Sequence, residues 1–101
     1  MTDAILSETA RIDVIEAIQW ISKENPSTAE ALRIAIVSAT RQLVEYPLSG
    51  TERPDVASSP TRFLTLTGFP YVLVYEAIND PPVILRVLHG SRDLPEILKL
   101  L

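Results

Sequence analysis

The spacing of apolar residues predicts two consecutive helices in the first half of the chain. One runs from Glu8 to about Glu24 and the next from about Pro26 to Tyr46, before Pro47 stops it. Ser7 and Asn25 are residues that favour helix N-caps. The apolar positions that recur at helical spacing are Val14, Ala17, Ile18 and Ile21, and then Ala29, Leu32, Ile36, Ala39 and Leu43. Because so short a connection joins two long helices, we expect an antiparallel helical hairpin.

After residue 61 the period of the pattern changes to two, which is typical of strands. The predicted strands are Arg62–Thr67, Tyr71–Ala77 and Val83–His89, with turn residues at 68–70 and 79–82 between them. We expect these strands to pair antiparallel as hairpins or a meander. A short strand is predicted at Asp3–Leu6, an ordered surface loop at 47–61, and a short helix or arm at 93–101.

The alternation along the strands predicts the two faces of the sheet. Val83, Leu85, Val87 and His89 are expected on one face, and Ile84, Arg86 and Leu88 on the other. One face should cover the helical hairpin, and the other should be a shallow platform on which function would be sought. Arg86 is expected to pair with Glu76 on the neighbouring strand. The fold class is therefore α+β: an N-terminal strand and a helical hairpin on a small twisted antiparallel sheet.

Composition narrows the class of protein. The length of 101 residues predicts a single domain, 1–101, and 47% apolar content argues against disorder. With no cysteine, disulfides and thiolate zinc sites are excluded. The N-terminus lacks a basic segment followed by a long apolar one, and no apolar run approaches a membrane span. We therefore expect a cytoplasmic protein with no membrane binding, no metal and no cofactor.

The net charge of −4 argues against non-specific binding of nucleic acid, which requires an excess of Lys and Arg. Residues 1–60 hold five basic groups against nine acidic ones, whereas residues 61–101 hold four of each. Any cationic surface is therefore expected to be small and to lie in the C-terminal part of the chain.

The segment Leu85–Pro95 carries most of the candidate chemistry. His89, Gly90 and Arg92 stand together where a predicted strand ends, which is a plausible place to bind an anion. Structural alternatives remain open for each residue. His89 could bond a neighbouring carbonyl, and Arg92 could pair with Asp93 at a helix start where Asp93 is the N-cap. Elsewhere, Tyr71 and Tyr75 could be core or rim aromatics and Arg62 a solubilising strand start. The apolar tail residues Leu94, Ile97, Leu98, Leu100 and Leu101 could pack on the fold or await a partner.

The order of these elements resembles the RelE/ParE superfamily of small bacterial toxins from type II toxin–antitoxin modules. The resemblance covers nearly the whole chain. It is carried by Asn25-Pro26, by Arg62 opening the second strand, by Pro70-Tyr-Val-Leu-Val-Tyr75 and by Ile84-Leu-Arg-Val-Leu-His-Gly-Ser-Arg-Asp93. It implies a helical hairpin packed on a twisted antiparallel sheet. It also implies an antitoxin partner that wraps the toxin with a helix and an extended segment.

Activities in the superfamily divide, and the residues favour one side. RelE-like members cut messenger RNA in the ribosomal A site, and ParE-like members poison DNA gyrase. Where RelE-like members carry two lysines, an arginine and a catalytic tyrosine, this chain has Phe63, Thr65, Val72 and Leu98. Only Arg92 matches their set, and cleavage of a phosphodiester without a metal needs charge stabilisation together with acid and base groups.

The sequence therefore predicts a ParE-like toxin that acts by binding, with DNA gyrase as its target and a cognate antitoxin as its neutralising partner. The residues predicted to bind target or antitoxin are Arg62, Tyr75, Arg86, His89 and Arg92. An enzymatic role is not favoured. The alternatives are a ribosome-dependent endoribonuclease that uses His89 and Arg92, and a non-toxic homologue that retains only antitoxin binding.

Overall fold

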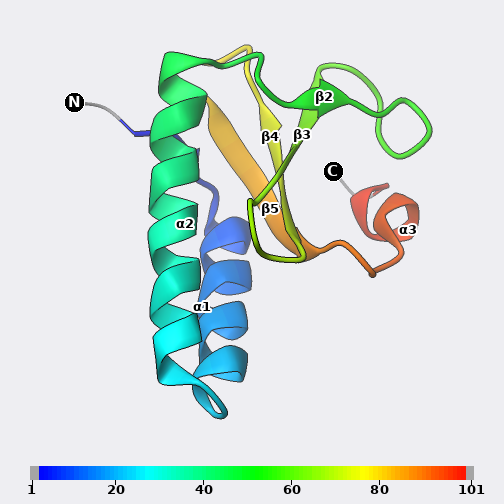
Figure 1. Cartoon of the computed structure of the whole chain (residues 1–101). Helices are drawn as coiled ribbons and strands as arrows, with labels where there is room; N and C mark the ends of the chain where they lie inside the picture. The colour runs from blue at the N-terminus through cyan, green and yellow to red at the C-terminus, as the bar shows by residue number, and fades with distance from the viewer. Residues whose placement is uncertain (1–2, 100–101) are drawn as a thin grey trace.

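The computed structural model describes residues 3–99, which form a helical hairpin, a five-stranded sheet and a short third helix (Figure 1). In chain order the elements are β1 (Ile5–Leu6), α1 (Glu8–Ser22), α2 (Pro26–Glu45), β2 (Thr51–Glu52), β3 (Thr61–Thr65), β4 (Tyr71–Glu76), β5 (Val83–His89) and α3 (Leu94–Leu98). The α+β class predicted from the sequence is confirmed. Within residues 3–99, no helix is both long enough and apolar enough to cross a bilayer.

Both predicted N-caps of the hairpin are confirmed. The Ser7 hydroxyl accepts a hydrogen bond from the Ala10 amide at 3.0 Å, and the Asn25 side chain accepts one from the Thr28 amide at 3.1 Å. The Ser7 hydroxyl also donates to the carbonyl of Leu85 at 2.9 Å. The residue that starts α1 therefore also fixes the helix to β5, 78 positions further along the chain.

The strand order is β1-β5-β4-β3-β2. The predicted antiparallel pairing of β3 with β4 and of β4 with β5 is confirmed. The short N-terminal strand β1 pairs in parallel with β5. The prediction of a loop throughout 47–61 is wrong at Thr51–Glu52, because β2 pairs there with β3. Both residues of β2 are exposed, so no alternation of apolar and polar positions marks the strand in the sequence.

A β-bulge breaks the predicted alternation of β5. Arg86 pairs with Val74 and Ile84 with Tyr75, which leaves Leu85 without a partner in the ladder. The side chains beyond the bulge change face, so Ile84 and Val87 pack in the same core cluster. The expectation that Ile84 lies on the face opposite Val87 was therefore wrong.

Both faces of the sheet are covered (Figure 1). Under the hairpin, residues such as Leu32, Leu43, Leu73 and Ile84 form the main core. On the opposite face Phe63, Val72, Val74 and Leu88 pack against Leu94 and Leu98 of α3. The predicted open platform is therefore wrong, because α3 closes it.

The apolar tail packs on the fold where the structure describes it. Leu94 and Leu98 are buried and Ile97 is partly buried, whereas the tail residues Leu100 and Leu101 lie outside the described residues. Asp93 occupies the N-cap position of α3, as predicted, but its side chain makes no capping hydrogen bond there.

Candidate functional site

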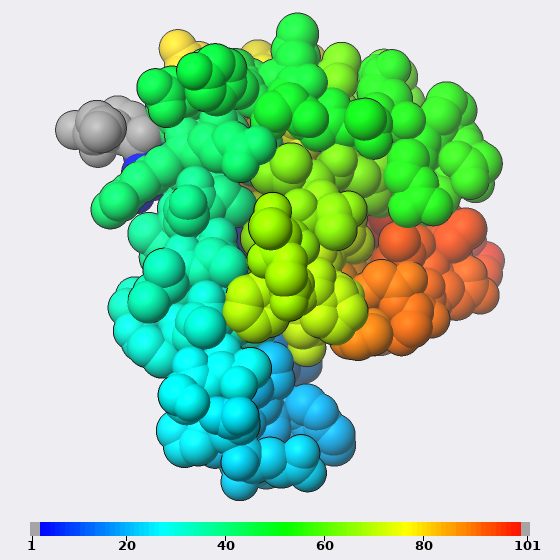
Figure 2. Space-filling view, viewed as in Figure 1, coloured from blue at the N-terminus to red at the C-terminus, as the bar shows by residue number. Residues whose placement is uncertain are grey.

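A cleft of about 250 Å³ lies between α1 and the end of β5, and we call it the α1–β5 cleft. It is lined by Asp13, Glu16, Ala17, Trp20, Tyr71, Val87, Leu88, His89 and Arg92. The connecting end of the hairpin, coloured blue to cyan, projects beyond the rest of the molecule in Figure 2. Because α1 extends along this projection, its outer turns present side chains beside the end of the sheet.

His89 is held at the rim of the cleft by its own turn. Its Nδ1 accepts a hydrogen bond from the Ser91 amide at 3.1 Å and lies 2.7 Å from the Ser91 hydroxyl. The imidazole meets the Tyr71 ring edge-on, with ring centroids 5.3 Å apart. Since an amide can only donate, the neutral ring carries its proton on Nε2. The predicted bond to a neighbouring carbonyl is replaced by one to Ser91, and Nε2 is left to donate to a ligand.

Arg92 lies beside His89 with its guanidinium exposed. Its main-chain amide donates to the His89 carbonyl at 3.1 Å, which closes the turn after β5. Among residues 3–99 the side chain forms no ion pair, and the ion pair with Asp93 considered from the sequence is absent from that part of the chain. The structure therefore brings His89 and Arg92 together on one cleft, as their spacing predicted.

Arg86 is held in place by an ion pair with Asp13 of α1. Its Nε and Nη2 donate to the Asp13 carboxylate at 2.8 and 3.0 Å, and the Val87 amide donates to the same carboxylate at 3.0 Å. The predicted pairing with Glu76 is wrong. Among residues 3–99 no strand pairs with the outer edge of β5 beyond Ile84, and there the Asp13 carboxylate of α1 accepts a hydrogen bond from the Val87 amide in place of a strand. In this structure the Arg86 guanidinium is committed to Asp13, and whether Arg86 also contacts a partner stays a prediction.

The charge on the Arg86 guanidinium is insensitive to pH in the neutral and acidic range. The hydrogen bonds that Arg86 donates to Asp13 raise the pKa of Arg86 above its already high ordinary value, although partial burial opposes this rise. A raised arginine pKa stabilises the fold at every pH below the ordinary value, and the effect is lost only as the pH rises through the raised one. The Arg86 guanidinium therefore stays charged throughout the neutral and acidic range.

Glu16 and Trp20 complete the cleft on the α1 side. Trp20 is 71% exposed, and the Lys23 ammonium lies 5.7 Å from its ring centroid. Glu16 makes no ion pair among the described residues. The cleft therefore offers an aromatic surface, the Arg92 guanidinium, one imidazole donor and the Glu16 carboxylate, which also interacts electrostatically with Arg86. This is a set suited to binding polar groups of both signs.

Arg62 and Tyr75 lie away from the cleft. Tyr75 is fully buried, and its hydroxyl accepts from the Gly50 amide and donates to the Pro47 carbonyl, both at 2.8 Å. The Arg62 guanidinium donates to the Gly50 carbonyl at 2.8 Å. Both predicted site residues therefore hold the chain after α2 against the sheet. Tyr71, in contrast, lines the cleft.

Sequence reasoning missed Asp13, Glu16 and Trp20 as cleft residues. In the helical pattern the two carboxylates are ordinary solvent-facing positions. Trp20 gave the one usable signal, because a large aromatic lay off the apolar stripe of its helix. No three His, Cys, Asp or Glu side chains gather as a metal site within residues 3–99.

The comparisons with known proteins agree with one another. Residues 4–94 match the family described as ParE toxin of type II toxin–antitoxin system, parDE. The candidate toxin Y4kP of Sinorhizobium fredii (strain NBRC 101917 / NGR234) is 38% identical over 88 residues, covering 87% of this chain and 85% of that protein. A solved structure of the chromosomal ParDE TA system from P. aeruginosa superposes with a TM-score of 0.70 at 22% identity. It covers 88% of this chain and 96% of its own, and so shows the shared fold.

Proposed function

Because the chain belongs to the ParE toxin family of type II toxin–antitoxin systems, we propose that it arrests growth by binding its target through the α1–β5 cleft. The target we propose is DNA gyrase, as the resemblance to ParE-like members implies, and the site of action is the cytoplasm. Binding without catalysis is the proposed mode of action. His89, Arg92 and Trp20 are the contacts, and a cognate antitoxin neutralises the protein.

The observation that most supports this proposal is that Trp20, His89 and Arg92 line the same cleft as the carboxylates of Asp13 and Glu16. Trp and Arg are the residues most enriched among the strong contacts of protein–protein interfaces. A carboxylate such as Glu16, which lines the same cleft as Arg92, would repel the phosphates of a message. The net charge of −4 disfavours docking on ribosomal RNA for the same reason. These features favour binding of a protein target over cleavage of a phosphodiester in messenger RNA.

Membership of the family implies an antitoxin partner. We place the antitoxin's helix in a second groove, of about 300 Å³, between α2 and β3. Ala31, Ala35 and Ser38 of α2 line this groove, and their small side chains would let a helix approach closely. Ile34, which is largely exposed, offers an apolar contact at its rim. The cleft for the target and this groove for the antitoxin use different residues.

Replacing Trp20 with alanine should weaken inhibition of gyrase supercoiling by about tenfold or more, since an exposed aromatic at a binding centre contributes at least that factor. Stability should hardly change, because the side chain is largely exposed. The measurement is the concentration of purified toxin that halves supercoiling. Ile15→Ala is the matched control, because Ile15 is an exposed apolar residue of α1 that does not line the cleft.

Three results would contradict the proposal. If folded wild-type protein leaves supercoiling unaffected at micromolar concentration, gyrase is not the target. If instead expression produces codon-positioned cuts in translated message that disappear in His89→Ala or Arg92→Ala, the protein is an endoribonuclease. Expression without growth arrest would identify a non-toxic homologue.

A further inference from the structure

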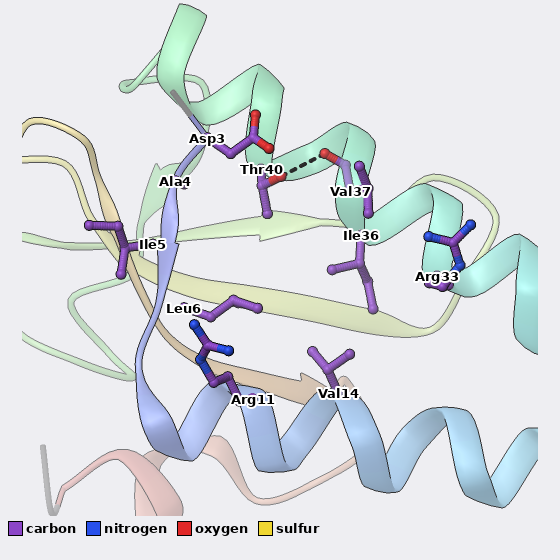
Figure 3. A pocket seen from close by; sticks show the side chains of 10 residues that line it. All are labelled: Asp3, Ala4, Ile5, Leu6, Arg11, Val14, Arg33, Ile36, Val37 and Thr40. Atoms are coloured by element: carbon purple, nitrogen blue, oxygen red, sulfur yellow. Dashed lines mark hydrogen bonds between the residues drawn. The ribbon is translucent and has the colours of Figure 1, made fainter. Parts of the chain in front are cut away.

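The hydroxyl group of Ser91 differs from the other described hydroxyl groups in the partner of its hydrogen bond. Its oxygen lies 2.7 Å from Nδ1 of His89, which is a base. Thr40 shows the ordinary arrangement at the wall of a cavity of about 310 Å³ between β1 and the two long helices, where its hydroxyl donates to the carbonyl of Val37 (Figure 3). The hydroxyl of Ser7 also donates to a main-chain carbonyl. Within residues 3–99, Ser91 alone has its hydroxyl beside an imidazole.

The direction of the bond between Ser91 and His89 follows from the same turn. The Ser91 amide donates to Nδ1 at 3.1 Å, so Nδ1 presents a lone pair and the proton of the neutral ring is on Nε2. The Ser91 hydroxyl therefore donates to Nδ1. A base within hydrogen-bond distance of a hydroxyl is the arrangement that activates serine as a nucleophile. Ser91 is exposed, so an electrophile from solvent can reach its Oγ.

The groups around the imidazole suit the role of a general base. The Tyr71 ring packs edge-on against it, with centroids 5.3 Å apart, and supports its orientation. Asp13 and Glu16 of α1 line the same cleft, and their negative charges favour a positive charge on the ring, which the charge of Arg92 opposes. The Arg92 guanidinium forms no ion pair among residues 3–99 and is available to stabilise the oxyanion that forms when a carbonyl is attacked.

We propose that Ser91 is a site of covalent modification that takes an acyl group from an activated ester, with His89 as its general base. Oγ attacks the carbonyl carbon while its proton passes to Nδ1. The new O–C bond forms, the bond from the carbonyl carbon to the leaving oxygen breaks, and Nδ1 gives the proton to that oxygen. The products are an O-acyl serine, the leaving alcohol and a neutral imidazole. Because a proton on Nδ1 faces the Ser91 amide, the ring holds it only until the leaving group takes it.

Acylation of Ser91 changes the α1–β5 cleft, and this part of the inference rests on the proposed function. Ser91 stands between His89 and Arg92, which are two of the proposed contacts to the target. The ester removes the hydroxyl donor that holds His89 and places an added group beside both contacts. We therefore expect the acylated protein to bind its target less well than the unmodified protein. Such a modification would inactivate the toxin without an antitoxin.

The test treats the full-length protein with p-nitrophenyl acetate, quenches samples in acid and locates the adduct by mass spectrometry. The wild-type protein should gain an acetyl group on Ser91. Hydroxylamine should remove this group, as expected for an ester, but not an acetyl group bound as an amide to Lys23 or Lys99. The acetylated protein should require about tenfold more to halve gyrase supercoiling, the usual effect of losing one strong contact.

Three variants separate the role of the base from that of the fold. Ser91→Ala should lose the adduct. His89→Asn keeps an oxygen acceptor for the Ser91 amide but has no base, and should form the adduct about a hundredfold more slowly, the lower end of what a positioned general base contributes. Ser59→Ala is the matched control, because the exposed Ser59 hydroxyl also donates at 2.7 Å, to the carboxylate of Glu52, which is a weaker base than imidazole. It should be acetylated at Ser91 as the wild type is.

Acetylation without preference for Ser91, or equal rates in the wild type and His89→Asn, would overturn the modification site. Undiminished inhibition of supercoiling by protein acetylated at Ser91 would overturn the inactivation and leave the site standing. If the unmodified protein does not inhibit supercoiling, the gyrase proposal fails and the inactivation falls with it. The mass measurement uses no gyrase, so it decides the modification site in either case.

Discussion

Asp13→Ala is expected to destabilise the fold by about 3 kcal/mol, at the lower end of the cost of breaking a buried ion pair. The substitution leaves the Arg86 guanidinium and the Val87 amide without their common acceptor. The two side chains retain only 19% and 10% of their accessible surface, so water can replace the carboxylate only in part. Urea denaturation should show the loss as a lower midpoint at an unchanged slope.

The pair Arg33–Glu30 supplies the control. Its nitrogen and oxygen are 2.6 Å apart, closer than those of Arg86 and Asp13, yet both side chains are more than half exposed. Glu30→Ala should therefore leave the denaturation midpoint unchanged within error. The double variant Asp13→Leu with Arg86→Met should recover part of the lost stability, because it leaves no partly buried charge without a partner. An Asp13→Ala midpoint equal to that of the wild type would show that the contact is not maintained in solution.

Gly50→Ala is expected to cost about 3 kcal/mol, the sum of overpacking and a lost hydrogen bond. A Cβ atom at this position would lie 2.6 Å from Tyr75 Cε1, 2.7 Å from the Tyr75 hydroxyl and 2.8 Å from the Phe63 carbonyl. The Tyr75 ring is fully buried and the Phe63 carbonyl belongs to β3, so displacing either group to make room for the added Cβ would cost free energy of folding. Thermal unfolding followed by circular dichroism would register the change as a drop of roughly 12–24 °C.

Gly90→Ala is the matched control for that substitution. The nearest atom to its added Cβ is the Pro70 carbonyl at 3.6 Å, an ordinary contact, so stability should change by less than about 0.5 kcal/mol. Tyr75→Phe separates the two contributions at Gly50. It removes the hydroxyl that accepts from the Gly50 amide but adds no atom, and should cost about 1–2 kcal/mol. Equal melting temperatures for Gly50→Ala and Gly90→Ala would contradict the predicted clash.

The sequence predicted best what depends on neighbouring residues. Ser7 and Asn25 cap their helices because a short side chain reaches an amide three residues away, a distance fixed by helical geometry. The strands β3, β4 and β5 were predicted from a period of two in the sequence, which needs no partner to be seen, although the bulge at Leu85 breaks it in β5. The strand β2 was not predicted, because its two exposed residues show no alternation of apolar and polar positions. They pair with β3 only after the chain folds back.

The candidate site was predicted in part for the same reason. His89 and Arg92 lie within one turn, so their spacing alone brought them together. Trp20 and Glu16 reach the cleft only because α1 runs past the end of the sheet. Arg62 and Tyr75 were assigned to the site as members of the segments that carry the family resemblance, but the loop after α2 folds over them and uses their polar atoms.

The sequence by itself determined the helices, the meander of strands and the motif that marks the family, because each is written in local spacing. Tertiary structure alone decided which groups are free to bind. Arg86 is neutralised by Asp13 from 73 positions away, the bulge at Leu85 redirects the side chains of β5, and α3 closes the face that the pattern left open. The physical reason is that charge, exposure and burial are properties of neighbours in space, and those neighbours come from distant parts of the chain.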